Sequence, residues 1–498
     1  MSEQLLIEGG LVYDHDGDVH RPRRADIRVA DDRIVAVGDA LAAPPDARRI
    51  DARRCLVVPG LINAHYHSHD VLCRGLFEEL TLEMWLLYTL PLGANRSKEE
   101  VRARTLVGAV ESLRAGITTV QDMLGLVPFA QDYLDTVLEA YRDAGIRVVF
   151  SPMVSDLPAV AMVANVDALP GDVQEMLGTR ALGANEQLDF LKAQLARHPA
   201  AGTLHWAVAP FAPQRCTQAM LGGCAEFAEK HDLPIYTHVY ETRGQALIAR
   251  DLYAEHGGSF IDYLDHAGVL GPRLNIVHSV WIVRKEMERL VEADAGIVLN
   301  ALSNMKLKSG VAPILDLREA GVRLGLGCDN CSDSDVQNMF QSMKMFCLLA
   351  AISDPEPGPA PAHEALRHAT VGNARSAGLG NMLGAIRPGF KADLVLIDLD
   401  DLAYLPFNSA ARQLVYTETG RGIDTVIVDG RVVVAGGEIK TVDMTALRRE
   451  VADLMRHFIA DYETIAAARR SALPHLLELH RQTWRRDLPM QRFLTRTR

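Results

Sequence analysis

The chain has 498 residues, a charged fraction of 23% and a formal net charge of −12. This length indicates two to four domains, or one large barrel with additions. Because the net charge is negative and phosphate backbones bind basic surfaces, we expect no nucleic-acid partner. The sequence shows neither a signal-peptide pattern nor a run of about 18 apolar residues, so we expect no membrane span. Seven cysteines, an odd number, are typical of reduced thiols, and we expect a cytoplasmic protein.

Short runs of alternating apolar residues fill the first 57 residues, for example LLIEGGLVYD and ADIRVADDRIVAVG. Separated by Gly and Asp turns, they predict an antiparallel sheet. The same pattern returns in KADLVLIDLDD and IDTVIVDGRVVVAGGEIK, between Lys391 and Lys440. We therefore expect residues 1–58 and 388–442 to fold together as one composite β-sandwich, with the middle of the chain inserted between them.

In the middle of the chain, short β-branched runs alternate with amphipathic stretches that are typical of helices. The expected strands are 57–66, 116–122, 147–153, 203–209, 234–239, 273–279, 296–300 and 322–328. Eight strands with helices between them predict an α/β fold, a (β/α)8 barrel of the TIM type over residues 59–387. A doubly wound open sheet would show the same alternation. Residues 443–498 are expected to form an appended helical extension.

Residues that can bind metal or carry protons follow four of the expected strands. They are His65 and His67 after the first, His238 with Glu241 after the fifth, His278 after the sixth and Asp329 after the eighth. The histidines of the first strand alternate, so their side chains share one face. A single buried histidine more often hydrogen-bonds to backbone. Because the ends of barrel strands meet at one edge, this coincidence favours a metal site with nitrogen and oxygen ligands.

Several motifs extend this pattern along the chain: PGLINAHYH, THVYET, IVHS, LSNMKLKSGVAP, GLGCDN, ALRHATVGNARSAGLG, LGAIRPGFKADLVLID and NSAARQLVYTETG. In this order they resemble the amidohydrolase superfamily, and within it the branch of triazine hydrolases and of S-adenosylhomocysteine, guanine and cytosine deaminases. The resemblance runs from about residue 5 to 445. It implies a barrel with a composite β-sandwich, one divalent metal and hydrolysis of a carbon–nitrogen or similar bond.

The resemblance also implies a role for each of the strand-end residues. The metal ligands would be His65, His67, His238 and Asp329, holding zinc or, as the alternative, iron(II). One metal is expected because the fourth strand, TLHWAVAPFAPQRC, lacks the lysine that bridges two ions in relatives. On that strand His205 is interpreted as structural.

The expected chemistry is the activation of water. A divalent ion lowers the pKa of bound water from about 15.7 toward 7, so that hydroxide can attack an electron-poor ring carbon. We expect Glu241 to carry the proton to the ring nitrogen and His278 to hydrogen-bond the water or the developing oxyanion. Asp329 would also accept a proton from the nucleophile. The alternative for Glu241 is a solvated carboxylate at a helix start.

Five further residues are expected to contact substrate. Phe211 and Gln214 stand in PFAPQ, where nucleoside-type deaminases of this branch have Pro-His-Ala-Pro followed by Tyr. Loss of that imidazole favours a flatter or more apolar substrate over a ribosyl one. His69 either extends into the pocket or supports the site from behind, and Trp85 either stacks on a planar ring or belongs to a helix core. Asn304 is the fifth, and the apolar segment 154–182 is expected to be a lid or an interface.

The leading hypothesis is a metal-dependent aminohydrolase that releases ammonia or an amine from a purine, pyrimidine, pterin or triazine. Hydrolysis of a urea, cyclic amide or aryl halide is the alternative within enzymes, and an inactive scaffold subunit is the alternative outside them. The complete set of candidate ligands disfavours the scaffold. A redox role for Cys328 and Cys331 is disfavoured because no second such pair exists. By resemblance we expect a homo-oligomer, a dimer or larger, with the helical extension as a candidate interface.

Overall fold

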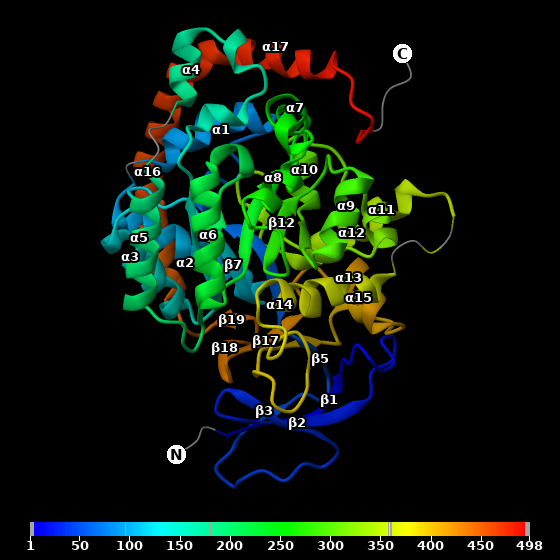
Figure 1. The fold of residues 1–498 in the computed structure, drawn as a ribbon. Helices are drawn as coiled ribbons and strands as arrows, with labels where there is room; N and C mark the ends of the chain where they lie inside the picture. The colour runs from blue at the N-terminus through cyan, green and yellow to red at the C-terminus, as the bar shows by residue number, and fades with distance from the viewer. Residues whose placement is uncertain (1–3, 95, 179–181, 357, 359–360, 494–498) are drawn as a thin grey trace.

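A computed structural model describes residues 4–94, 96–178, 182–356, 358 and 361–493 (Figure 1). Within these residues the strands form three sheets, one of nine strands and two with parallel strands. Helices cover the parallel strands, and the nine-stranded sheet lies at the opposite end of the molecule from α17 (Leu473–Trp484). The α/β fold expected from the sequence is confirmed.

The nine-stranded sheet combines strands from both ends of the chain. The N-terminal strands are β1 (Gln4–Val12), β2 (Arg24–Ala30), β3 (Arg33–Gly38), β4 (Arg48–Asp51) and β5 (Cys55–Pro59). The C-terminal strands are β16 (Leu394–Asp398), β17 (Ile423–Val428), β18 (Arg431–Ala435) and β19 (Glu438–Ile439). Strands β5 and β16 pair antiparallel, with Leu394 opposite Pro59. The two β-rich pieces therefore join in one sheet, whereas its arrangement as a two-layered sandwich stays a prediction.

The parallel strands carry the eight expected runs. One sheet contains β6 (Leu61–His67), β7 (Ile117–Leu124), β8 (Arg147–Val154), β9 (Leu204–Trp206), β10 (Ala209–Pro210) and β15 (Asp329–Asn330). The other contains β11 (Ile235–Val239), β12 (Leu274–His278), β13 (Gly296–Leu299) and β14 (Arg323–Leu326). A parallel bridge between Val208 and Ile235 connects the sheets on one side. On the other side the chain passes from β14 directly into β15, which pairs with β6.

The expected strand 57–66 is corrected by the structure, because it is two strands in two sheets. Strand β5 ends at Pro59 in the nine-stranded sheet, and β6 begins at Leu61 among the parallel strands. Between them, a Cβ atom on Gly60 would lie 2.1 Å from the hydroxyl oxygen of Thr118. Only glycine allows the chain to pass this close to β7 as it changes sheets.

Seventeen α-helices are present in the described part of the chain. Those between or beside the parallel strands are α1 (Leu82–Gly93), α2 (Lys98–Arg114), α3 (Gln131–Ala144), α4 (Gly171–Leu177), α5 (Ala184–Arg197), α6 (Gln218–His231), α7 (Arg243–Leu252), α8 (Phe260–His266), α9 (Arg284–Glu292), α10 (Ala301–Lys306), α11 (Ile314–Ala320), α12 (Met339–Ser353), α13 (Ala362–Arg367) and α14 (Asn373–Ser376). After them come α15 (Ala410–Tyr416), α16 (Met444–Arg469) and α17. Their ends follow local chemistry: α2 begins with a capping box between Ser97 and Glu100, and α3 ends at Gly145 with φ of 77°.

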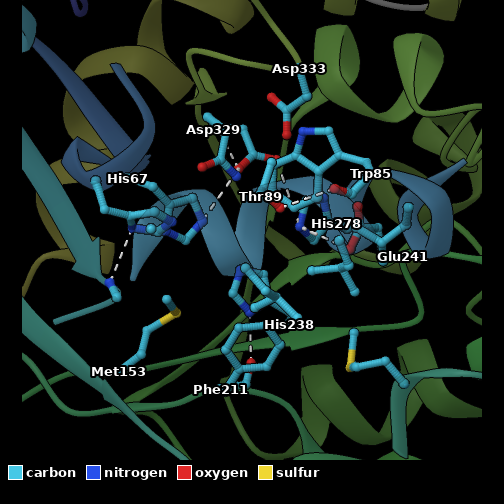
Figure 2. A pocket seen from close by; sticks show the side chains of 18 of the residues that line it. His67, Trp85, Thr89, Met153, Phe211, His238, Glu241, His278, Asp329 and Asp333 are labelled. Atoms are coloured by element: carbon cyan, nitrogen blue, oxygen red, sulfur yellow. Dashed lines mark hydrogen bonds and ion pairs between the residues drawn. The ribbon is translucent and has the colours of Figure 1, made fainter. Parts of the chain in front are cut away.

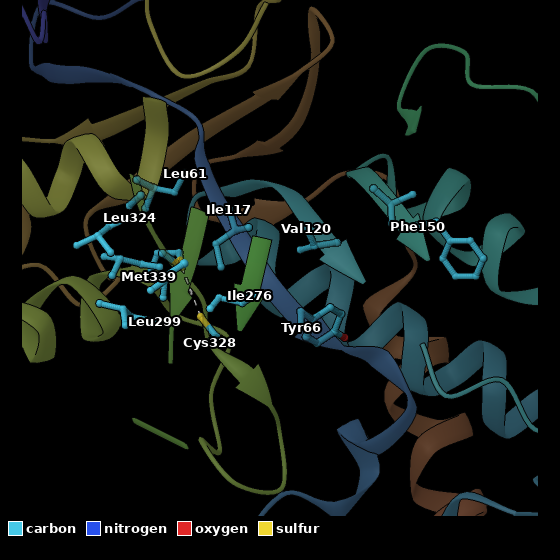
Figure 3. Close-up of a cluster of buried hydrophobic side chains, with 14 of the residues drawn as sticks. Leu61, Tyr66, Ile117, Val120, Phe150, Ile276, Leu299, Leu324, Cys328 and Met339 are labelled. Atoms are coloured by element: carbon cyan, nitrogen blue, oxygen red, sulfur yellow. Dashed lines mark hydrogen bonds between the residues drawn. The ribbon is translucent and has the colours of Figure 1, made fainter. Parts of the chain in front are cut away.

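The main core lies between the parallel strands and their helices (Figure 3). Apolar side chains of successive strands fill it, among them Ile117, Val120, Ile276 and Leu324, all at most 3% exposed. Cys328 belongs to this core, and its thiol contacts Met339 sulfur at 3.6 Å. All seven cysteines of the chain lie in the described part, and each is buried and free. The Cys328–Cys331 pair is therefore part of the packing around β15.

The last two helices pack on the rest of the molecule, α16 along one side and α17 across the end opposite the nine-stranded sheet (Figure 1). They bury Phe458, Leu476 and Leu479 against Leu82 and Trp85 of α1 in a second apolar cluster. None of the helices in the described ranges is both long and apolar enough to cross a membrane.

Candidate active site

The carboxyl ends of the parallel strands bring the expected site residues together (Figure 2). His65 and His67 end β6, His238 lies in β11, His278 ends β12 and Asp329 begins β15. The Nε2 atoms of His65 and His67 are 3.1 Å apart, and they lie 3.3 and 3.4 Å from Asp329 Oδ1. Nitrogens of His65, His238 and His278 lie within 4.8 Å of one another. Residues more than 260 positions apart thus form one cluster.

The hydrogen bonds behind the cluster fix which ring nitrogen faces it. His67 Nδ1 lies 2.5 Å from the Met123 carbonyl oxygen, and His238 Nδ1 lies 2.6 Å from that of Phe211. A carbonyl oxygen only accepts, so each Nδ1 carries the proton and donates it. The Nε2 atoms are left with free lone pairs that face the cluster, as metal-binding histidines require.

The donor atoms fit a single divalent metal. Zinc lies about 2.0–2.1 Å from imidazole nitrogen and carboxylate oxygen, so tetrahedral ligand atoms are separated by roughly 3.3 Å. The distances of 3.1, 3.3 and 3.4 Å among His65, His67 and Asp329 match this value. Burial lowers the pKa of His65 to about 4, against the opposing effect of Asp329. A neutral imidazole is the form that binds metal.

Left-handed backbone conformations occur at the ends of the strands that carry the site. Tyr240, His278, Ser279 and Asp329 have φ between 54° and 73°. Such conformations cost on the order of 1 kcal/mol or more for a residue other than glycine, and they persist only where the surroundings hold them. Here the Ser279 amide donates to the Val239 carbonyl and the Trp281 amide to the Tyr240 carbonyl, both at 3.0 Å. The segments after β11 and β12 therefore hold each other in place.

Glu241 lies beside the cluster, just before α7. Its side chain is buried, and Oε2 is 3.7 Å from Nε2 of His278. Burial, followed by the negative charges of Asp329 and Glu83, raises the pKa of Glu241 well above its ordinary value. The alternative of a solvated carboxylate at a helix start does not apply to a side chain that is 4% exposed.

A cavity of about 120 Å³ opens next to the cluster (Figure 2). One wall is apolar and consists of Leu82, Trp85, Leu86, Leu90, Val127, Met153, Met162 and Phe211. The polar residues that line it are Thr89, His67, His69, His238, Glu241, His278, Asp329, Asn330 and Asp333. Among the residues that the structure describes, no arginine or lysine lines this cavity.

Three of the five expected substrate contacts line the cavity. Trp85 does so while its indole nitrogen donates to Ser332 Oγ at 2.9 Å, so the ring is held in one orientation. Phe211 forms part of the apolar wall, with the guanidinium of Arg215 stacked behind it. His69 also lines the cavity, and its Nδ1 accepts a hydrogen bond from the Gly125 amide at 3.1 Å. His69 and Trp85 therefore both line the cavity and hold neighbouring groups in place, and their contact with substrate stays a prediction.

The other two residues expected to contact substrate, Gln214 and Asn304, do not line this cavity. Gln214 lies in the short helical turn Pro213–Arg215 and points behind the wall, where its amide donates to the sulfur of Met162. Asn304 does not line the cavity either; its Oδ1 lies 2.9 Å from His278 Nδ1 and fixes that ring. His205 lies at the other end of the strands, 3.3 Å from Arg147, in agreement with its structural interpretation.

Sequence analysis missed Asp333, although it lies only four residues after Asp329. The side chain is 1% exposed and lines the cavity, and no hydrogen-bond partner within the described residues reaches its Oδ1 atom. The run DNCSDSD after the eighth strand contains three acidic residues, and this cluster of carboxylates is the sequence feature that could have pointed to Asp333. Asp70 was also missed; its carboxylate accepts the amides of Cys331 and Ser332, both at 3.0 Å, and thereby shapes the same loop.

The segment 154–182 contributes to the cavity. Its described part contains Ala159–Met162, Val166–Ala168 and α4, while residues 179–181 lie outside the described ranges. Met162 lines the apolar wall, and Val163, Leu169 and Val173 pack in the cluster with α1. The segment therefore covers one side of the site.

Comparisons with known proteins agree with this geometry. The model of the Amidohydrolase family matches residues 56–433. The 5'-deoxyadenosine deaminase of Methanothermobacter thermautotrophicus is 32% identical over 444 residues, which are 89% of this chain and 96% of that protein. The 5-methylthioadenosine/S-adenosylhomocysteine deaminase of Pyrococcus furiosus is 31% identical over 440 residues, 88% of this chain and 97% of that one.

Solved structures of zinc-containing hydrolases are also similar to this chain. An adenosine deaminase from Xanthomonas campestris with bound zinc has a TM-score of 0.80 at 26% identity, over 92% of this chain and 98% of that one. The atrazine chlorohydrolase of Arthrobacter aurescens complexed with zinc has a TM-score of 0.80 at 25% identity, over 90% and 99% of the two chains. The chain belongs to the amidohydrolase family and is a hydrolase that acts on carbon–nitrogen bonds.

Proposed function

We propose that the protein is a metal-dependent deaminase that removes an amino group from a six-membered nitrogen heterocycle of the adenine type. The observation that carries this proposal is the convergence of His65, His67 and Asp329 at 3.1 to 3.4 Å beside the buried Glu241 and a cavity. The names of the two sequence relatives support it, since each names a deaminase of an adenine-containing compound.

One divalent ion would be held by His65, His67, His238 and Asp329. Zinc is our expectation, supported by the zinc in the solved relatives, and iron(II) is the alternative. An ion at this position supplies the Lewis acidity that makes water a nucleophile at neutral pH. Asp329 is oriented for this role, because its Oδ2 accepts from Ser303 Oγ at 2.7 Å and its Oδ1 accepts from the Asn330 amide at 2.9 Å.

Glu241 would carry the protons of the reaction. It takes one from the attacking water and delivers it to the ring nitrogen next to the attacked carbon. As the carbon–oxygen bond forms, Glu241 takes the remaining proton from that oxygen and passes it to the amino group, with Asp329 as a second acceptor beside it. The carbon–nitrogen bond then breaks and ammonia leaves.

His278 would orient the attacking water. Its Nδ1 proton points to Asn304 Oδ1, so the neutral ring presents the Nε2 lone pair to the reacting atoms. That nitrogen can accept a hydrogen bond from water, and when it is protonated it can donate one to the developing oxyanion. Asn304 therefore supports the reaction through His278.

The cavity indicates an uncharged substrate with an apolar substituent. Phe211 and the other apolar wall residues offer no partner to a carboxylate, and a buried unpaired charge would cost several kcal/mol. Asp333 can accept a hydrogen bond from an N–H or O–H group of the substrate. The names of the two sequence relatives outweigh our expectation of a substrate without a ribosyl group, so we propose ribosyl adenine compounds and place 5'-deoxyadenosine and 5'-methylthioadenosine ahead of S-adenosylhomocysteine, which carries a carboxylate. The apolar wall also favours a second candidate function, hydrolysis of an aryl halide by the same residues.

A substrate panel tests the proposal. Purified protein, loaded with zinc or iron(II), would be assayed for ammonia with adenine nucleosides, cytosine, guanine, a pterin and an aminotriazine, and for chloride with a chlorotriazine. We expect about one metal ion per chain and ammonia from at least one adenine-type compound, with activity lost after chelation and restored by metal. Absence of bound metal after loading, or no product from any compound, would refute the proposal.

Several expectations about the whole molecule are proposals as well. We propose that the two parallel sheets form one closed eight-stranded barrel over residues 59–387, supported by the Val208–Ile235 bridge and the pairing of β15 with β6. Residues 1–58 and 388–442 would form the composite β-sandwich, and 443–498 the helical extension. A cytoplasmic homo-oligomer, a dimer or larger, stays a prediction.

A further inference from the structure

The end of the chain closes over the segments that carry Glu241 and His278. We call residues 483–493 the C-terminal clasp. Its first contact is with Arg243, two residues after Glu241. The guanidinium donates from Nε to the Thr483 carbonyl at 3.0 Å and from Nη2 to the Arg486 carbonyl. It also lies over the rings of both Trp484, at 4.9 Å, and Trp281, at 5.2 Å, and these two indoles pack edge to face with their centroids 6.1 Å apart.

The second contact is with the segment after His278. Arg492 donates from Nε to the Val280 carbonyl and from Nη2 to the Ile282 carbonyl, both at 2.8 Å. The Arg492 carbonyl in turn accepts the Val311 amide at 2.9 Å. The rings of Trp484 and Phe493 pack edge to face at 5.1 Å, which joins the two contacts within the clasp.

The segments held in this way are strained. Tyr240 precedes Glu241 with φ of 55°, and His278 and Ser279 have φ of 73° and 54°. Two backbone hydrogen bonds join the two segments to each other, as described above. The clasp adds four hydrogen bonds and the contacts of Arg243 with the Trp281 and Trp484 rings. A strained backbone keeps its conformation only where the surrounding contacts hold it.

We propose that the C-terminal clasp positions Glu241 and His278 for catalysis, with Arg243 and Arg492 as its two positioning residues. This inference rests on the proposed deaminase function. The carboxylate of Glu241 must reach the reacting atoms, yet its own backbone amide is bonded to Gln245 within the same segment, at 2.7 Å. The position of the Glu241 carboxylate therefore depends on where the clasp holds the start of α7. A displacement of 1 Å at a reacting group can cost about 100-fold in rate.

The test uses single and double variants of the full-length, metal-loaded enzyme. Arg243→Gln removes the charge from the two indole rings and leaves at most one of the two carbonyl contacts. We expect kcat to fall about tenfold, with KM within about threefold and metal content unchanged. Arg243→Lys keeps a charge next to the rings and should restore part of the rate. Arg485→Gln is the matched control: it lies in the same segment, and within the described residues its guanidinium bonds only to Glu478, at 3.2 Å, so it should behave as wild type.

A double variant separates positioning from a general loss of active protein. In the Glu241→Gln background, Arg243→Gln should lower kcat no further, because the group it positions has already lost its function. A merely structural role would lower kcat by the same factor in both backgrounds and overturn the inference. Arg492→Gln with His278→Gln gives a second, independent cycle should Arg243→Gln fail to fold. Wild-type kinetics in both single variants would also overturn it, whereas an inactive wild-type enzyme would refute the proposed function itself.

Discussion

The two ends of the parallel strands both bury charged side chains but treat them differently. At the amino end, Arg147 is fully buried and donates to Asp393 through two nitrogens at 2.9 and 3.1 Å, to Asp429 at 2.8 Å and to the Gly202 carbonyl at 2.7 Å. At the carboxyl end, Glu241, Asp329 and Asp333 lie near one another, and no arginine or lysine lines the cavity within the described ranges.

The difference indicates that the amino end of the strands provides stability, and it supports our proposal that the carboxyl end provides reactivity. Around Arg147 each charge meets an opposite charge, and the network joins β8 to the nine-stranded sheet through Asp393 and Asp429. At the carboxyl end, buried carboxyl groups and imidazole nitrogens without an arginine or lysine partner in the described cavity lining are left for the proposed metal and substrate. Variants at the amino end should therefore change stability alone, and variants at the carboxyl end should change activity.

The largest expected effect is on stability. Arg147→Met removes the cation from two carboxylates and should lower the free energy of unfolding by about 3–5 kcal/mol. Urea denaturation measures this change, and kcat of the folded protein should stay the same. Arg102→Met is the matched control, because its pair with Asp143 is 41% and 50% exposed and should contribute less than about 1 kcal/mol. Equal losses in both variants would contradict the comparison.

The next effect is on turnover. Glu241→Gln keeps the size of the side chain but cannot exchange protons, so kcat should fall by about 100-fold or more. Elemental analysis should find the metal content of wild type, and the urea midpoint should not decrease. Activity near the wild-type value would remove Glu241 from the mechanism.

A smaller effect is expected on substrate binding. Asp333→Leu removes the carboxylate that faces the cavity without a partner at Oδ1, while the apolar replacement fills similar space. KM should rise by roughly three- to tenfold for a substrate that offers an N–H or O–H group to this position, with kcat changed less. An unchanged KM across the substrate panel would show that Asp333 makes no substrate contact.

The smallest expected effect is on how the free energy of unfolding depends on pH, through His205 at the amino end of the parallel strands. Burial first, and then the charges of Arg147 and Lys391, lower the pKa of His205 to about 4. Because the folded state binds this proton more weakly than the unfolded chain, His205 costs stability as the pH falls from about 6.5 to 4. His205→Gln should make that decline shallower, which urea titrations at pH 7, 5.5 and 4.5 would reveal. A steeper or identical decline would mean that another group dominates.

Much of the site could be predicted because metal chemistry restricts the residue types. Alternating histidines at His65 and His67 and single donors at His238, His278 and Asp329 stood at strand ends, and the structure gathers them. Gln214 and Asn304 could not be placed, because the direction of a loop side chain depends on its neighbours. The Gln214 side-chain amide donates to the sulfur of Met162, and the Asn304 Oδ1 atom accepts from Nδ1 of His278. Asp333 was missed because nothing local distinguishes a cavity carboxylate from a solvated one.

By itself, the sequence determined the order of strands and helices, the chemical character of the site and the family, since periodicity and donor types are local properties. Only the tertiary structure decided that Gly60 separates two sheets, that Asp333 faces the cavity and that residues 483–493 close over Arg243 and the segment after His278. These depend on contacts between residues up to about 240 positions apart. Such contacts form only after the chain has packed, and their partners leave no pattern in the local sequence.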